Sequence, residues 1–216
     1  GFNLHGWFIN REISPEHPLI IYYGGNAEEI SHNLFDLEKY EKESLLFMNY
    51  RSYGKSTGSP SQASLFSDAL FIFDHFSDTY SISSTNIILM GRSLGAAVAT
   101  YVAKHRQVKA VILISPFDSL VKIAQEHYPV FPVKLLLKQP FESVQIAQDI
   151  TAPMMAIIAG QDRIISNERS VNLVEHWGGK SHYVTIKDAG HNTISNYPKY
   201  WDTLRLFLSK MAKSSV

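Results

Sequence analysis

Residues 87–97 read Ile-Ile-Leu-Met-Gly-Arg-Ser-Leu-Gly-Ala-Ala, and this stretch decides the fold. A run of four apolar residues leads into Gly-x-Ser-x-Gly, and small residues suited to the start of a helix follow. A strand that turns this sharply into a helix needs glycine on both sides of the serine, because other side chains there would collide with the strand and the helix. Such a turn holds the hydroxyl of Ser93 above the edge of a sheet, near backbone N–H groups at a helix N-terminus. Ser93 is therefore the predicted nucleophile.

The rest of the chain alternates between short apolar runs and helical patterns. We expect strands at residues 4–9, 19–23, 44–50, 87–90, 108–115, 154–159 and 181–186. Helices are expected at residues 28–43, 64–78, 96–105, 167–176 and 200–211. This alternation predicts an α/β fold with a mostly parallel central sheet flanked by helices, in a single domain over residues 1–216. The carboxyl ends of the strands then lie along one edge, where residues distant in the sequence meet.

The composition is that of an ordinary globular protein, and it narrows the function classes. The chain has 20 basic and 20 acidic residues with no basic stripe, which argues against a nucleic acid partner. It has no cysteine, so disulfides, thiolate chemistry and zinc held by cysteine are excluded. No apolar run approaches the roughly 18 residues that span a bilayer. The sequence does not begin with Met, so an anchor upstream of Gly1 stays open. The absence of cysteine favours a cytoplasmic location. A cysteine-free exported protein and a membrane-associated protein with an upstream anchor are the alternatives.

The predicted nucleophile needs a base to take its proton, and the base needs a carboxylate that orients it. Of the nine histidines, only His191 combines a place just past the end of an expected strand with a preceding glycine. For the carboxylate, Asp162 follows the strand at residues 154–159. Asp118 follows the strand before it and is a second candidate, although we expect it to cap the segment that comes next. The predicted triad is Ser93, His191 and Asp162.

The oxyanion that forms when a serine attacks a carbonyl requires two backbone N–H donors. One is expected from Leu94, directly after the nucleophile. The other is expected from the turn Gly24-Gly25-Asn26-Ala27, with Asn26 as the donor, because this turn ends the strand at residues 19–23. The alternative is a plain turn between a strand and a helix.

Residues 117–149 break the regular alternation, with prolines between short helix-like pieces. Their aromatic and aliphatic side chains fit a short lid that lines an apolar pocket for an acyl chain. Tyr128, Phe131 and Phe141 are the predicted substrate-binding residues of this lid. The alternative is that these side chains cover the core.

The chain resembles the α/β-hydrolase superfamily along essentially its whole length, and within it the Bem46/ABHD13 group, often classed beside the S9-type serine peptidases. The resemblance rests on the stretches Tyr22-Tyr23-Gly24-Gly25-Asn26-Ala27, Asn49-Tyr50-Arg51-Ser52-Tyr53-Gly54-Lys55-Ser56, Gly91-Arg92-Ser93-Leu94-Gly95, Gly160-Gln161-Asp162 and Ala189-Gly190-His191-Asn192. It implies that these stretches supply the oxyanion turn, a structural turn, the nucleophile, the acid and the base. The chain departs from the family pattern at Gly24, where the family has His, and at Asn49 and Ser52, where it has Asp and Gly.

These features together predict a serine hydrolase that acts by acyl transfer on a small-molecule substrate, a carboxylic ester or thioester. Water is the second reactant, so no cofactor is expected, and no metal. A serine peptidase or amidase on small substrates is the runner-up, and a non-catalytic binding protein on the same fold is a further alternative. A phosphate-binding loop ending at residues 53–57 is disfavoured, because position 49 lacks the glycine that this motif needs.

Overall fold

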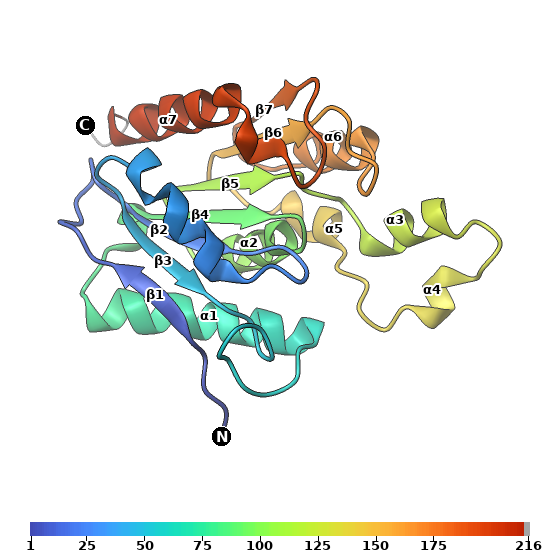
Figure 1. Ribbon diagram of the computed structural model, residues 1–216, viewed down its shortest axis with the longest axis horizontal. Coiled ribbons are helices and arrows are strands. Elements are labelled where there is room, and N and C mark those ends of the chain that lie inside the picture. The colour runs from blue at the N-terminus through green and yellow to red at the C-terminus, as the bar shows by residue number, and fades with distance from the viewer. Residues whose placement is uncertain (214–216) are drawn as a thin grey trace.

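The computed structural model describes residues 1–213 and contains a seven-stranded sheet with helices on both faces (Figure 1). The strands are β1 (Gly6–Ile9), β2 (Leu19–Tyr23), β3 (Ser44–Met48), β4 (Ile87–Arg92), β5 (Ala110–Ile114), β6 (Met154–Ala159) and β7 (Ser181–Ile186). Their order across the sheet is β1-β3-β2-β4-β5-β6-β7. β1 runs antiparallel to β3 at one edge, and every other neighbouring pair is parallel. The expected α/β class with a mostly parallel sheet is confirmed.

Each strand contributes to two cores, because successive side chains point to opposite faces of the sheet. In β2, Leu19, Ile21 and Tyr23 pack into one core, and Ile20 and Tyr22 pack into the other. The first core lies under helices α1 (Gln62–Thr79), α2 (Leu94–His105), α5 (Ser143–Ala147) and α6 (Asn167–Glu175). The second lies under the 3-10 helix η1 (Ile30–Lys39) and helix α7 (Pro198–Lys213). Both faces are covered, which explains why the central strands are apolar throughout.

The first expected helix, at residues 28–43, is a shorter 3-10 helix, η1. The side chains that it packs into the second core are Ile30, Leu34 and Leu37, and Tyr40 follows directly after it. Intervals of three and four residues also occur in amphipathic α-helices, so the spacing in the sequence does not separate the two helix types. The prediction was therefore right in position but wrong in helix type.

The remaining elements are short. The 3-10 helix η2 (Ser84–Asn86) leads into β4, and η3 (Ile194–Asn196) leads into α7. No helix within residues 1–213 combines the length and the apolar character that crossing a membrane requires.

The segment expected to form a lid divides into two parts near Pro140. Residues 120–140 leave the body of the protein as an arm that carries α3 (Leu120–His127) and α4 (Val133–Leu136), at the right of Figure 1. The arm is closed at its base, where the N–H of Leu120 donates to the carbonyl oxygen of Pro140 at 3.1 Å. Beyond it the chain returns to the body, and α5 packs against α2. We call residues 120–140 the arm.

Phe141 belongs to the core and not to the arm. Its side chain is 5% exposed, and its ring meets the ring of Phe66 edge to face, with 5.5 Å between the ring centroids. This position corrects the expectation that Phe141 lines a substrate pocket in the lid. Full burial of a phenylalanine side chain contributes about 1.5–3 kcal/mol to the free energy of folding, which favours the inward position of Phe141. For Phe141, the alternative interpretation is therefore the right one: its side chain covers the core.

Candidate active site

Ser93 is the single residue between the end of β4 at Arg92 and the start of α2 at Leu94. Its backbone adopts φ 53° and ψ −115°, in the left-handed half of conformational space that residues other than glycine rarely occupy. The turn is also too tight for side chains at the flanking positions. A Cβ on Gly95 would lie 1.9 Å from the carbonyl oxygen of Tyr23, and a Cβ on Gly91 would lie 2.2 Å from the carbonyl oxygen of Gly95. The glycines of the motif thus have the steric role that the sequence suggests.

The structure brings Ser93, His191 and Asp162 together in a line of two hydrogen bonds, and we call these three residues the Ser93 row. Nε2 of His191 lies 3.1 Å from Oγ of Ser93, and Nδ1 lies 2.7 Å from Oδ2 of Asp162. Both acid and base are buried, with 8% of the His191 side chain and 2% of the Asp162 side chain exposed. With its proton on Nδ1, the imidazole can accept the hydroxyl proton of Ser93 at Nε2. The three residues come from three different strand ends, β4, β6 and β7.

The Asp162 carboxyl is held in its ionised form. Burial by itself would raise its pKa, but the hydrogen bond from His191 and the backbone N–H of Ile165 outweigh burial, so the pKa lies below its ordinary value. Its second oxygen accepts the N–H groups of Ile164 and Ile165, each at 2.9 Å. A charged carboxylate in this place can orient the imidazole and stabilise the imidazolium that forms in a proton transfer.

The turn after β2 lies beside the serine. A Cβ on Gly25 would be 3.7 Å from the Cβ of Ser93. The Tyr53 hydroxyl fixes the next two residues, since it donates to Oδ1 of Asn26 at 2.9 Å and accepts the N–H of Ala27 at 3.1 Å. Leu94, the other predicted donor, is the first residue of α2. The predicted oxyanion turn and the predicted nucleophile are therefore neighbours in the structure.

Arg92, the variable residue before Ser93 in Gly-x-Ser-x-Gly, ties the surrounding loops together. One of its nitrogens pairs with Oε2 of Glu28 at 3.2 Å, and the same oxygen accepts the N–H of Gly25 at 2.6 Å. Its other terminal nitrogen donates to Oδ1 of Asn192 at 2.8 Å and to the carbonyl oxygen of His191 at 3.3 Å. One guanidinium thus fixes the oxyanion turn relative to the histidine loop. The position of Arg92 beside Ser93 places it at the site, but the sequence does not predict its contacts with Glu28 and with the His191 loop.

Comparison with known sequences adds to this geometry. The model of the serine hydrolase family matches residues 73–210, a range that contains the turn at Ser93 and extends past His191. The chain belongs to the serine hydrolase family.

Two relatives cover nearly the whole of this serine hydrolase. An uncharacterized protein of Mycobacterium tuberculosis is 31% identical over 98% of this chain and 77% of its own length. The alpha/beta hydrolase domain-containing protein WAV2 of Arabidopsis thaliana is 28% identical over 98% of this chain and 76% of its own length. Among solved structures, the acetyl xylan esterase from Paenibacillus sp. R4 matches 97% of this chain and 80% of its own, with a TM-score of 0.78 and 17% identity. These similarities confirm the α/β-hydrolase fold.

Asp118, the second candidate acid, has other partners in this serine hydrolase. Its side chain is fully buried at the carboxyl end of β5. Oδ2 accepts from Lys122 at 3.1 Å, from Arg169 at 3.0 Å and from Asn172 at 2.6 Å. Asp118 thus joins the base of the arm to α6. The carboxylate that contacts His191 is that of Asp162.

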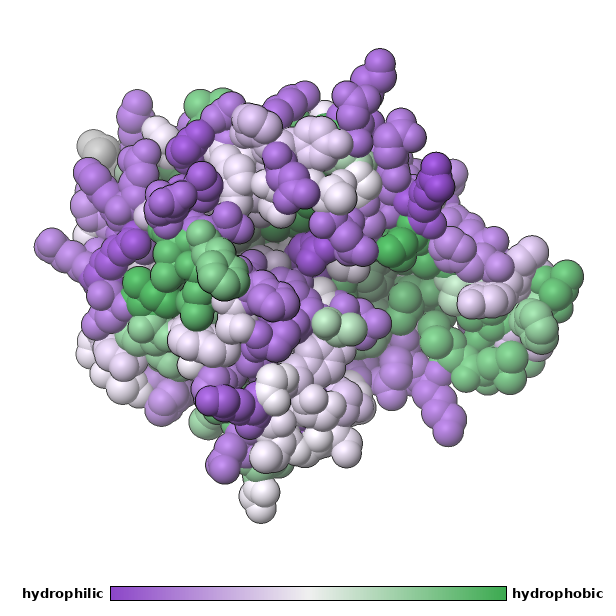
Figure 2. Space-filling view, viewed as in Figure 1, coloured by the Kyte–Doolittle hydropathy of each residue, from purple (hydrophilic) through white to green (hydrophobic). Residues whose placement is uncertain are grey.

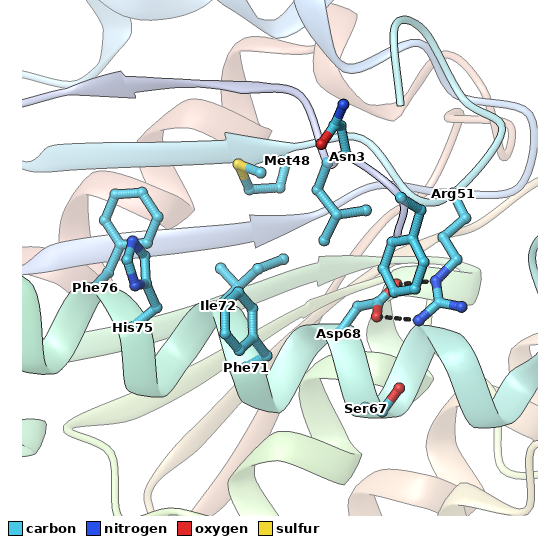
Figure 3. A pocket seen from close by; sticks show the side chains of 11 residues that line it. Asn3, Met48, Arg51, Ser67, Asp68, Phe71, Ile72, His75 and Phe76 are labelled. Carbon is cyan, nitrogen blue, oxygen red and sulfur yellow. Dashed lines mark hydrogen bonds and ion pairs between the residues drawn. The ribbon is translucent and has the colours of Figure 1, made fainter. Parts of the chain in front are cut away.

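The two other predicted substrate-binding residues lie on the arm. The side chains of Tyr128 and Phe131 are 60% and 55% exposed. A separate groove of about 630 Å³ lies between the segment before β1 and helix α1 (Figure 3). Among its lining residues, Arg51 pairs with Asp68 at 2.6 and 2.8 Å and lies over the ring of Phe2. This groove shares no lining residue with the Ser93 row, so it has no part in the chemistry below.

Among residues 1–213, no group of three or more His, Asp and Glu side chains is arranged to hold a metal ion. The residues that converge on Ser93 are instead those of proton transfer and of oxyanion binding.

Proposed function

We propose that this chain is a serine hydrolase that transfers the acyl group of a carboxylic ester or thioester to water. The observation that carries the proposal is the continuous row from the Asp162 carboxylate through the His191 ring to Oγ of Ser93, at 2.7 and 3.1 Å. The backbone conformation of Ser93 supports it, since strained backbone of this kind is found where a side chain must be presented to a substrate. The resemblance to the Bem46/ABHD13 group is part of the same proposal.

The reaction has two halves. Oγ of Ser93 attacks the carbonyl carbon while Nε2 of His191 takes its proton, and Asp162 stabilises the imidazolium. The negative charge on the carbonyl oxygen is received by the N–H groups of Leu94 and Asn26. The imidazolium then gives its proton to the leaving alcohol or thiol, and an acyl-serine remains. Water, deprotonated by the same imidazole, attacks this ester, and the carboxylic acid leaves as Ser93 regains its proton.

Arg92 acts as a positioning residue in this scheme. It contacts the carbonyl oxygen of His191 on one side and Glu28 on the other, and Glu28 in turn holds the N–H of Gly25. The oxyanion donors and the base must be correctly placed at the same moment, because a misplacement of about 1 Å can cost about 100-fold in rate. A single guanidinium that joins both loops meets this requirement.

A panel of substrates tests the proposed substrate class. We expect turnover of p-nitrophenyl esters, with kcat/KM that varies along the series from acetyl to dodecanoyl, because an acyl pocket of fixed size prefers one length. Peptide p-nitroanilides should react far more slowly, since an amine is a poorer leaving group. Comparable kcat/KM for an ester and for a p-nitroanilide would favour the alternative, a serine peptidase or amidase. Release of p-nitrophenolate is measured against enzyme-free buffer.

A further inference from the structure

The tip of the arm carries a concentrated set of exposed apolar side chains. They are Tyr128 (60% exposed), Val130 (85%), Phe131 (55%), Leu135 (84%) and Leu136 (62%). Five of the twelve large apolar side chains that are exposed within residues 1–213 thus fall in a stretch of nine residues. Figure 2 shows hydrophobic residues gathered over the protruding end of the molecule. Scattered exposed apolar residues need no explanation, but a contiguous set of this kind marks an interaction surface.

The charge of the tip has one sign. No Asp or Glu occurs between Tyr128 and Pro140, whereas Lys134 and Lys138 do. Within the described chain, neither lysine forms an ion pair, in contrast to Lys122 at the base of the arm, which pairs with Asp118. The tip therefore presents apolar side chains flanked by two available positive charges.

The arm presents this surface in a defined conformation. At the tip, the N–H of Phe131 donates to the carbonyl oxygen of Tyr128 at 3.2 Å, and the Gln125 side chain donates to the carbonyl oxygens of Tyr128 and Pro129 at 3.2 and 3.0 Å. Farther down, Arg169 pairs with Glu126 at 3.0 Å. An ordered surface loses less conformational entropy on binding than a disordered one does.

The arm also touches the candidate active site. The His127 ring lies 2.9 Å from the carbonyl oxygen of Ile164, whose N–H is bound by Asp162. Ile164 is itself 47% exposed. The arm is thus in direct contact with the loop that carries Asp162.

We propose that the tip of the arm docks on the surface of an anionic lipid bilayer. Val130, Phe131 and Leu135 enter the boundary between headgroups and acyl chains, and Lys134 and Lys138 meet the phosphates of anionic lipids. A second copy of the chain is the less suitable occupant, because a two-fold contact between two tips would place lysines against lysines with no carboxylate between them. The docking does not depend on acyl transfer, so each can fail without the other.

Flotation with vesicles tests the docking. We expect the protein to float with phosphatidylcholine vesicles that contain phosphatidylserine, and much less with phosphatidylcholine alone. The triple variant Val130→Ser, Phe131→Ser, Leu135→Ser should bind at least about 100-fold more weakly, because three apolar side chains leave the lipid. The matched control is Phe35→Ser, Phe71→Ser, Leu206→Ser, which removes three exposed apolar side chains from other surfaces and should bind as the wild type does.

A second variant keeps the test decisive if the triple variant is poorly folded. Lys134→Glu, Lys138→Glu leaves the apolar side chains in place and should weaken binding by about fivefold or more for each lysine. Ser93→Ala should float as the wild type does, which separates docking from catalysis. Wild-type protein that does not float, or a tip variant that floats unchanged, would overturn the proposal. So would a wild-type dimer in light scattering that the tip substitutions dissociate while no form of the protein binds vesicles.

Discussion

Replacement of Ser93 by Ala is expected to lower kcat for p-nitrophenyl esters by about 10⁵-fold or more. Oγ of Ser93 is the atom that forms the bond to the acyl group, and Nε2 of His191 lies 3.1 Å from it. The oxyanion donors and the rest of the site remain, so the residual rate should still exceed that of buffer. Initial rates of wild type and variant, at equal concentrations of folded protein, measure the effect.

Ser59→Ala is the matched control for this substitution, because Ser59 is an exposed serine outside the Ser93 row. It should retain kcat within about twofold, as surface substitutions usually do. Retention of activity by Ser93→Ala would show that another group carries the hydrolysis.

Asp162→Asn is expected to lower kcat by about 10⁴-fold. The amide keeps the size of the carboxyl but carries no charge, so it does not stabilise the imidazolium and can favour the wrong tautomer of His191. Binding of substrate changes little, because Asp162 is buried behind the histidine and does not reach the acyl group. The measurement is kcat and KM, each compared between variant and wild type, on the ester that the wild type prefers.

Asp118→Asn provides the contrasting measurement. This carboxylate is fully buried and pairs with Arg169 and Lys122, so its neutralisation should reduce the free energy of unfolding by about 3 kcal/mol. The kcat of the folded fraction should stay within a few-fold of the wild type. The assignment of the acid would be wrong if Asp118→Asn lost the activity and Asp162→Asn retained it.

The strands and the turn at Ser93 were predictable because each is encoded by adjacent residues. The β6 and β7 ranges, Met154–Ala159 and Ser181–Ile186, match the expected strands at both ends. Their apolar runs are short and end in turn residues, which leaves few alternatives. The meeting of Ser93, Asp162 and His191 at one edge followed from the parallel sheet, since strand ends of one polarity share an edge.

Other features depend on contacts that the sequence does not display. The spacing of the apolar residues in η1 gives no signal for its 3-10 form. The inward turn at Phe141 reflects its packing against Phe66. The link from Arg92 to Glu28 joins residues 64 positions apart, and no local pattern reports such a pairing. Long-range side-chain contacts are therefore where the sequence analysis was incomplete.

The most direct test of acyl transfer at Ser93 is covalent labelling with a fluorophosphonate probe, read from the intact mass and from the labelled peptide. We expect one probe for each chain, on the peptide that contains Ser93. Labelling should be absent from Ser93→Ala and from protein unfolded in denaturant, because the reaction requires the folded row of Asp162, His191 and Ser93. Folded wild-type protein that stays unlabelled, or that carries the probe on another residue, would contradict the proposed mechanism.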